Sequence, residues 1–223
     1  MKYYVLSATQ SDDCPIGLEE DAILYMNKEQ ISDDFQYGTL PWYSYKTSKN
    51  CDLPKDGILF LKRKNIKLSF RSITSNVYVI NEVVKDILEK YIESDFISVR
   101  VLNSKLEKYD DINYYIFKFN KYINMKEVAD LDRSIYHLNE YDTLFLEKIF
   151  MLDEVNKSIF KIKNITSAQD TLFINDEVEN EIDKVKPIGI NIFEVDTAKW
   201  RHGDDFSYLF LPIEEVNQLV WPI

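Results

Sequence analysis

Two segments of the chain share one order of strand, cap and helix. In the first, residues 76–80 are mostly β-branched or aromatic, and apolar side chains then recur at helical spacing over residues 82–93. Asn81 stands between them, where its side chain can accept a hydrogen bond from the first turn of the helix. Residues 96–101 then alternate apolar and polar side chains. The pattern predicts a β-α-β unit over residues 77–101.

The second segment repeats this order towards the C-terminus. Residues 171–178 align with residues 77–84, and the step from Ile to Asn recurs at the same place. A helical apolar face follows, Pro187 ends it, and a strand resumes at residues 189–195, which predicts a second β-α-β unit over residues 171–195. Four aligned positions are identical. An old duplication would explain them, and the shared order of strand, cap and helix would also produce such matches.

The remaining apolar patterns are mainly strand-like. We expect a first strand at the N-terminus, loops over the acidic and proline-containing residues 9–56, and a short closing helix after Pro212. Further strands are predicted over residues 112–122, in a hairpin of residues 144–152 with 158–165, and in a hairpin of residues 57–61 with 65–70.

These elements together predict an α+β fold, mostly antiparallel β-sheet with a few short helices and the two similar β-α-β units. We expect a loop-rich and β region over residues 1–75 and an α+β region over residues 76–223. The two regions could form one continuous domain, or the chain could consist of two similar halves.

The amino-acid composition limits the classes of partner that the protein can bind. The 223 residues are 45% hydrophobic and include 13 Phe, 15 Tyr and 3 Trp, which suffices for a substantial core. A net charge of −11 repels phosphate backbones and anionic lipid, so we expect neither nucleic acid nor membrane as a partner. No apolar run approaches the ~18 residues of a membrane-spanning helix, and the N-terminus lacks a signal-peptide pattern, so a cytoplasmic location is expected.

Residues that carry chemistry are scarce. The chain has only five Gly, two His and two Cys, and these small numbers argue against phosphate-binding loops, zinc clusters and His-dependent catalysis. We therefore expect no enzyme, no metal and no cofactor. Asp130 and Asp132 could share a cation, but Arg133 follows them directly, and a capping or solvated role fits better. His137 and His202 lack a neighbouring nucleophile or metal ligand.

The two cysteines, Cys14 and Cys51, have no second cysteine nearby. Two free thiols are expected in a reducing cytoplasm, although the sequence leaves a disulfide between them open.

Aromatic residues in polar surroundings are the candidate partner-binding residues: Trp42, Tyr43, Trp200, Asp204 and Asp205. Trp and Tyr dominate binding hot spots because they bury much area for little lost rotamer freedom, and the acids would steer a basic partner. The alternative is that these aromatics pack into the protein's own core.

The order of several short segments resembles bacterial immunity proteins, nearest to immunity protein family forty-three and the related family eleven, the MXAN-type immunity domain. The likeness runs over most of the chain and is strongest from about residue 75 to 195. The segments are Tyr3-Tyr4-Val5-Leu6, Val79-Ile80-Asn81, Tyr114-Tyr115-Ile116-Phe117-Lys118-Phe119, Asp130-Leu131-Asp132-Arg133-Ser134, Ser158-Ile159-Phe160-Lys161-Ile162, Leu172-Phe173-Ile174-Asn175-Asp176 and Gly189-Ile190.

The resemblance implies a protein that binds and neutralises one cognate toxin domain without chemistry of its own, in competition between bacteria that deliver toxins by contact-dependent or type VI secretion routes. An acidic inhibitor suits a toxin with a basic cleft. The alternative function is a non-inhibitory adaptor or structural module of a secretion or phage-like assembly that uses the same aromatic surfaces.

Overall fold

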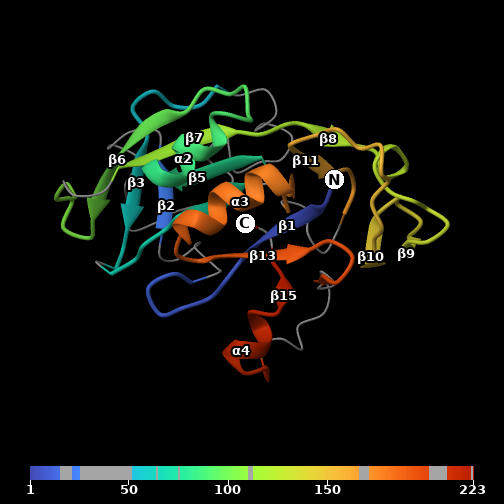
Figure 1. The fold of residues 1–223 in the computed structure, drawn as a ribbon. Helices are drawn as coiled ribbons and strands as arrows, with labels where there is room; N and C mark the ends of the chain where they lie inside the picture. Colours follow the sequence, from blue (N-terminus) through green and yellow to red (C-terminus); the bar gives the residue numbers. More distant parts are fainter. Residues whose placement is uncertain are drawn as a thin grey trace. The chain divides into compact units, whose positions relative to one another are not determined.

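The computed structural model describes residues 1–15, 22–25, 52–63, 65–74, 76–109, 113–165, 171–200, 210–221 and 223 (Figure 1). The chain divides into two units, of which unit 1 comprises Met1–Gln10 and Asn120–Ile223, and unit 2 comprises Ser11–Phe119. The expected division after residue 75 does not appear. It would separate β4 from β5, which are paired strands of unit 2. The fold class is α+β with mostly antiparallel sheet, as predicted.

Unit 2 is built on a six-stranded sheet in the order β2-β3-β6-β7-β5-β4. Its neighbours pair antiparallel, except that β3 runs parallel to β6. Helix α2, Glu82–Leu88, follows β5 directly. The strands are β2 (Ala22–Tyr25), β3 (Ile58–Leu61), β4 (Phe70–Thr74), β5 (Val77–Asn81), β6 (Ile97–Asn103) and β7 (Tyr114–Lys118).

Unit 1 is built on a five-stranded sheet in the order β13-β1-β12-β11-β8, with the helix α3, Asp176–Val185, directly after β12. Two separate two-stranded sheets pair β9 with β10 and β14 with β15. The remaining bounds are β1 (Tyr3–Ala8), β8 (Tyr122–Ile123), a 3-10 helix at Met125–Glu127, β9 (Ile135–Leu138), β10 (Leu144–Lys148), β11 (Ile159–Ile162), β12 (Phe173–Asn175), β13 (Ile190–Glu194), β14 (Lys199–Trp200), α4 (Ile213–Val216) and β15 (Leu219–Val220).

Several sequence predictions are confirmed, and the two predicted hairpins are wrong. The N-terminal strand and the short helix after Pro212 are present as β1 and α4. However, β10 pairs with β9 rather than with β11, and β3 pairs with β2 and β6 rather than with β4. Apolar alternation marks a strand but does not identify its partner, because the partner can lie far away in the sequence.

The two predicted β-α-β units are confirmed and have the same topology. In unit 2, β5 and β6 both pair antiparallel with β7, which lies between them. In unit 1, β12 and β13 both pair antiparallel with β1, which lies between them in the same way. Each helix is capped by the last residue of the preceding strand: the side chain of Asn81 accepts a hydrogen bond from Val84 N at 3.0 Å, and that of Asn175 accepts one from Val178 N at 3.1 Å.

The likeness extends to the middle strands. Both begin with two tyrosines, and in each the first tyrosine's hydroxyl accepts a backbone N–H, Tyr114 from Leu68 at 3.0 Å and Tyr3 from Lys157 at 3.3 Å. The middle strand comes last in unit 2, as β7, and first in unit 1, as β1. The two units therefore share one arrangement in which the order of the strands along the chain is circularly permuted.

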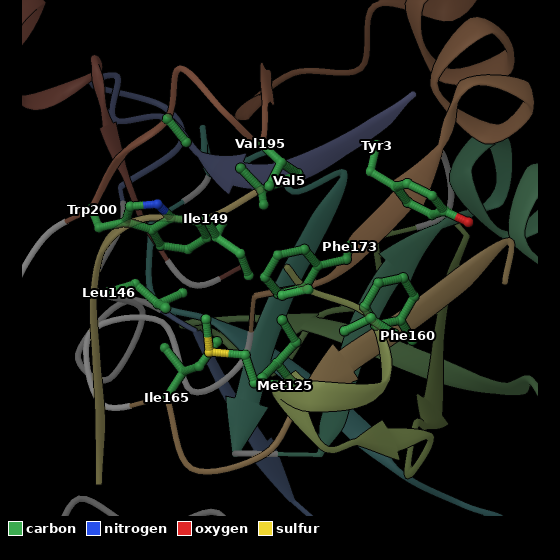
Figure 2. Packing of buried hydrophobic residues seen from close by; sticks show 14 of the residues in the cluster. Tyr3, Val5, Met125, Leu146, Ile149, Phe160, Ile165, Phe173, Val195 and Trp200 are labelled. Atoms are coloured by element: carbon green, nitrogen blue, oxygen red, sulfur yellow. The ribbon is translucent and has the colours of Figure 1, made fainter. Parts of the chain in front are cut away.

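Each unit has its own cluster of buried hydrophobic residues, and the central strands of each sheet are buried on both faces. In unit 1, Phe173 stacks on Phe160 on one side and on Trp200 on the other, with ring centroids 5.3 and 5.9 Å apart (Figure 2). In unit 2, the position that matches Phe160 is Arg71, since each is the cross-strand partner of the corresponding residue in β12 or β5.

Arg71 is a cation inside the unit 2 core, with 1% of its surface exposed. Its guanidinium donates to Phe70 O at 2.7 Å and to Cys14 Sγ at 3.1 Å. Burial raises the pKa of the Cys14 thiol, and the nearby guanidinium opposes that rise. Cys14 is free and buried, and Cys51 lies outside the described residues.

We predict that Asn81→Ala and Asn175→Ala each lower the free energy of unfolding by about 1 kcal/mol, because each removes the cap of one helix. Urea denaturation followed by far-UV circular dichroism would measure the loss. Asp at either position keeps a capping oxygen and should restore most of it. Equal stability of both Ala variants and the unchanged protein would show that the caps are unimportant.

Candidate protein-binding surface

Trp200 is not an exposed binding residue, contrary to the sequence expectation. Its side chain lies in the core of unit 1 with 8% of its surface exposed, stacked on Phe173 (Figure 2). The cause is strand alternation: in β14, Trp200 is buried while Lys199 is exposed, and Ala198 just before the strand is buried on the same side as Trp200. The polar residues next to Trp200 in the sequence therefore do not predict whether its side chain is exposed.

The other four candidate residues, Trp42, Tyr43, Asp204 and Asp205, lie outside the described residues, and so does His202. The carboxylate of Asp130 accepts hydrogen bonds from the backbone N–H groups of Asp132 and Arg133 at 3.1 and 3.3 Å. It therefore caps a turn, and within the described part of the chain no group of three or more potential metal ligands comes together.

The hairpin of β9 and β10 in unit 1 is organised by its tip, residues 139–142. The side-chain oxygen of Asn139 accepts hydrogen bonds from the backbone N–H groups of Tyr141 and Thr143, both at 2.9 Å. The backbone of Asn139 also donates to Thr143 O and accepts from Asp142 N, each at 3.1 Å. Asp142 adopts a left-handed conformation with φ 57°, which Asp and Asn tolerate better than most residues. These bonds hold the tip in one conformation.

The two faces of the hairpin differ in burial. On the inner face, Leu144 and Leu146 are buried in the core of unit 1, with Tyr136 packed beside them. On the outer face, His137 is exposed and stacks on its cross-strand partner Phe145, with centroids 4.5 Å apart and planes at 3°. Apolar residues therefore occupy both faces of a two-stranded sheet that buries only one.

Three large apolar side chains of the hairpin are open to solvent: Ile135 at 53%, Leu138 at 55% and Tyr141 at 78%. We call these three residues, with His137 and Phe145, the hairpin surface. Figure 1 shows the hairpin at one end of unit 1, away from α3. Ile135 shares the outer face with His137 and Phe145, whereas Leu138 lies on the face of its partner Leu144 and Tyr141 lies at the tip. Several exposed apolar residues on one hairpin are typical of protein interfaces, whereas single ones are ordinary.

Acidic side chains flank the tip half of the hairpin surface. Glu140, Asp142 and Glu147 are exposed, and residues 134–147 contain no Lys or Arg. The cations lie at the base of the hairpin, where Arg133 and Lys148 both sit over the ring of Phe150, at 4.4 and 4.9 Å from its centroid. The tip half of the hairpin is therefore uniformly negative, which favours a basic partner.

An open cavity of about 660 Å³ lies elsewhere in unit 1, between β8, β11 and residues 154–157. Its lining combines apolar side chains with two cations, Lys121 and Lys157, and two anions, Glu127 and Glu154. This balance of charges favours neither an anionic nor a cationic ligand, and we assign the cavity no function.

Neither a scan against models of protein families nor a search of curated proteins found a match to the chain. In the described part of the chain, no helix has the length and apolar character to span a membrane.

Sequence reasoning missed the hairpin surface, although a signal for it was present. A turn-forming segment, Asn139 to Asp142, separates two apolar runs, which is a hairpin signal. In the first run, residues 135–138, apolar or aromatic side chains stand at both parities, so one set must remain outside if the hairpin packs on one face only.

We predict that Trp200→Ala lowers the free energy of unfolding by about 3–5 kcal/mol, because it leaves a cavity beside Phe173. Trp200→Phe should cost less, because it keeps a stacked ring and because the buried indole N–H has no hydrogen-bond partner to lose among the described residues. Chemical denaturation of both variants would measure the difference. An Ala variant as stable as the unchanged protein would contradict the placement of Trp200 in the core.

Proposed function

We propose that this chain is a cytoplasmic immunity protein that binds one bacterial toxin domain and neutralises it by occlusion. The observation that supports the proposal most is the hairpin surface, a rigid set of exposed aromatic and aliphatic side chains flanked by acids in its tip half. The resemblance of the strand and turn order to immunity families forty-three and eleven points in the same direction.

The energetics of inhibition fit such a surface. A stable inhibitor buries roughly 1,200–2,000 Å² in total and concentrates its affinity in a few large side chains. Tyr141, Phe145 and Ile135 provide side chains of this kind without first having to leave the core. The net charge of −11 and the acids near the tip would raise the rate of encounter with a basic toxin.

The proposal requires no chemistry from the chain. The carboxylate of Asp130 is occupied by two backbone N–H groups, and the ring of His137 is stacked on Phe145. Binding alone can inhibit an enzyme when it covers the cleft that the substrate must enter.

We expect the chain to restore growth of cells that express the product of the gene adjacent to its own, and the two purified proteins to form a stable complex. Asp132→Ala should protect as well as the unchanged chain, because the proposal gives this carboxylate no catalytic role. Colony counts and size-exclusion chromatography would measure the two effects.

The outcomes of this experiment separate the candidate functions. A complex that forms without restoring growth would favour the non-inhibitory adaptor. The absence of both complex and protection would overturn the immunity proposal, and loss of protection by a folded Asp132→Ala variant that still binds would point to an enzyme instead.

A further inference from the structure

We infer that the tip of the β9–β10 hairpin inserts into a cation-lined cleft of the toxin that otherwise holds a nucleic-acid strand. This inference rests on the proposed function and names the part of the partner that the hairpin surface fits. Four properties of residues 139–142 support the inference: their shape, their rigidity, their charge and the order of their side chains.

The shape of the tip indicates a concave partner. Tyr141 is 78% exposed, and Leu138 on the adjoining strand is 55% exposed. A convex projection of this kind is covered on several sides only when it enters a cleft, and binding hot spots are usually found in such desolvated pockets. A flat partner would leave most of the Tyr141 ring in water.

The tip is already ordered before it binds. Four hydrogen bonds within residues 139–143 fix its backbone, two of them to the side-chain oxygen of Asn139. Tyr141 itself has only two rotatable side-chain torsions. The entropy lost on binding is therefore small, so more of the contact energy remains as affinity.

The order of side chains at the tip resembles that of a nucleotide strand. Tyr141 stands between two exposed acids along the chain, Glu140 and Asp142, as a base in a nucleotide strand stands between phosphates. A cleft that binds single strands combines cations for the backbone with surfaces on which bases stack. Such a cleft would accept the ring and pair its cations with the two acids.

The outer face of the hairpin extends this contact. Phe145 and His137 form a stacked pair next to the tip, and Ile135 continues the same face towards the base. These side chains would cover the rim of the cleft, where the exclusion of water strengthens the ion pairs made by the tip.

The test uses the purified product of the adjacent gene, a fluorescently labelled single-stranded DNA oligonucleotide and variants of the full chain. The unchanged chain should displace the oligonucleotide from the toxin. Tyr141→Ala should speed dissociation of the protein complex by ~30-fold or more, and Tyr141→Phe should change it little, because the ring and not the hydroxyl fills the cleft.

The acids are tested by Glu140→Gln combined with Asp142→Asn, where Asn keeps the left-handed backbone conformation at residue 142. This variant should associate ~10-fold more slowly at low salt and show a flatter salt dependence. The matched control is Asp153→Asn with Glu154→Gln, which removes the same charge from another exposed turn of unit 1 and should have a smaller effect.

Each outcome decides the inference. The unchanged chain could bind and protect while the tip variants bind equally well, or the tip and control variants could slow association equally. Either result would show that the tip does not enter the cleft and that another surface carries the immunity function. A toxin that binds the chain but not the oligonucleotide would overturn the assignment of its cleft. Failure of the unchanged chain to bind would overturn the proposed function itself.

Discussion

One residue in each unit ends a strand and begins a helix, and this double role determines the arrangement around it. The backbone N–H of Asn81 donates to Ser69 O at 3.1 Å while its side chain caps α2, and Asn175 makes the matching bond to Ser158 O at 3.0 Å. No loop intervenes, so the helix lies close to the strand it leaves. Because a helix is about 10 Å wide and strands are about 4.8 Å apart, the returning strand lies two strand positions away. The gap is filled by a third, antiparallel strand.

Local features of this scaffold could be predicted from sequence, and the choice of strand partners could not. Features that depend only on residues close together in the sequence were all predicted: the Asn caps, the two helices and the strands beside them. In unit 2 the gap is filled by β7, which follows β5 and β6 along the chain. That β1 would fill the gap in unit 1 depends on residues more than a hundred positions apart in the sequence, because β1 pairs with β12 and β13. The hairpins predicted at residues 57–70 and 144–165 failed for the same reason: adjacency in sequence was taken as adjacency in the sheet.

The candidate site shows the same division between local and non-local information. Trp200 was taken for a surface residue because its neighbours in sequence are polar, but burial is decided by the alternation of β14 over the core of unit 1. The hairpin surface was overlooked because its apolar residues look like core residues. A core position and an interface position use the same side chains, and only the packing of the rest of the unit shows that Ile135, Leu138 and Tyr141 stay exposed.

The comparison of the two units shows where unit 1 differs from the arrangement that the two share. All the described strands of unit 2 belong to one sheet, whereas unit 1 has the separate β9–β10 hairpin between β8 and β11. The hairpin contributes Leu144 and Leu146 to the core of unit 1. Its exposed apolar residues favour aggregation and contribute little to the core. Exposed apolar side chains that add little to the core of their own unit are the kind of surface that a partner would cover, and this supports the proposed binding role of the hairpin.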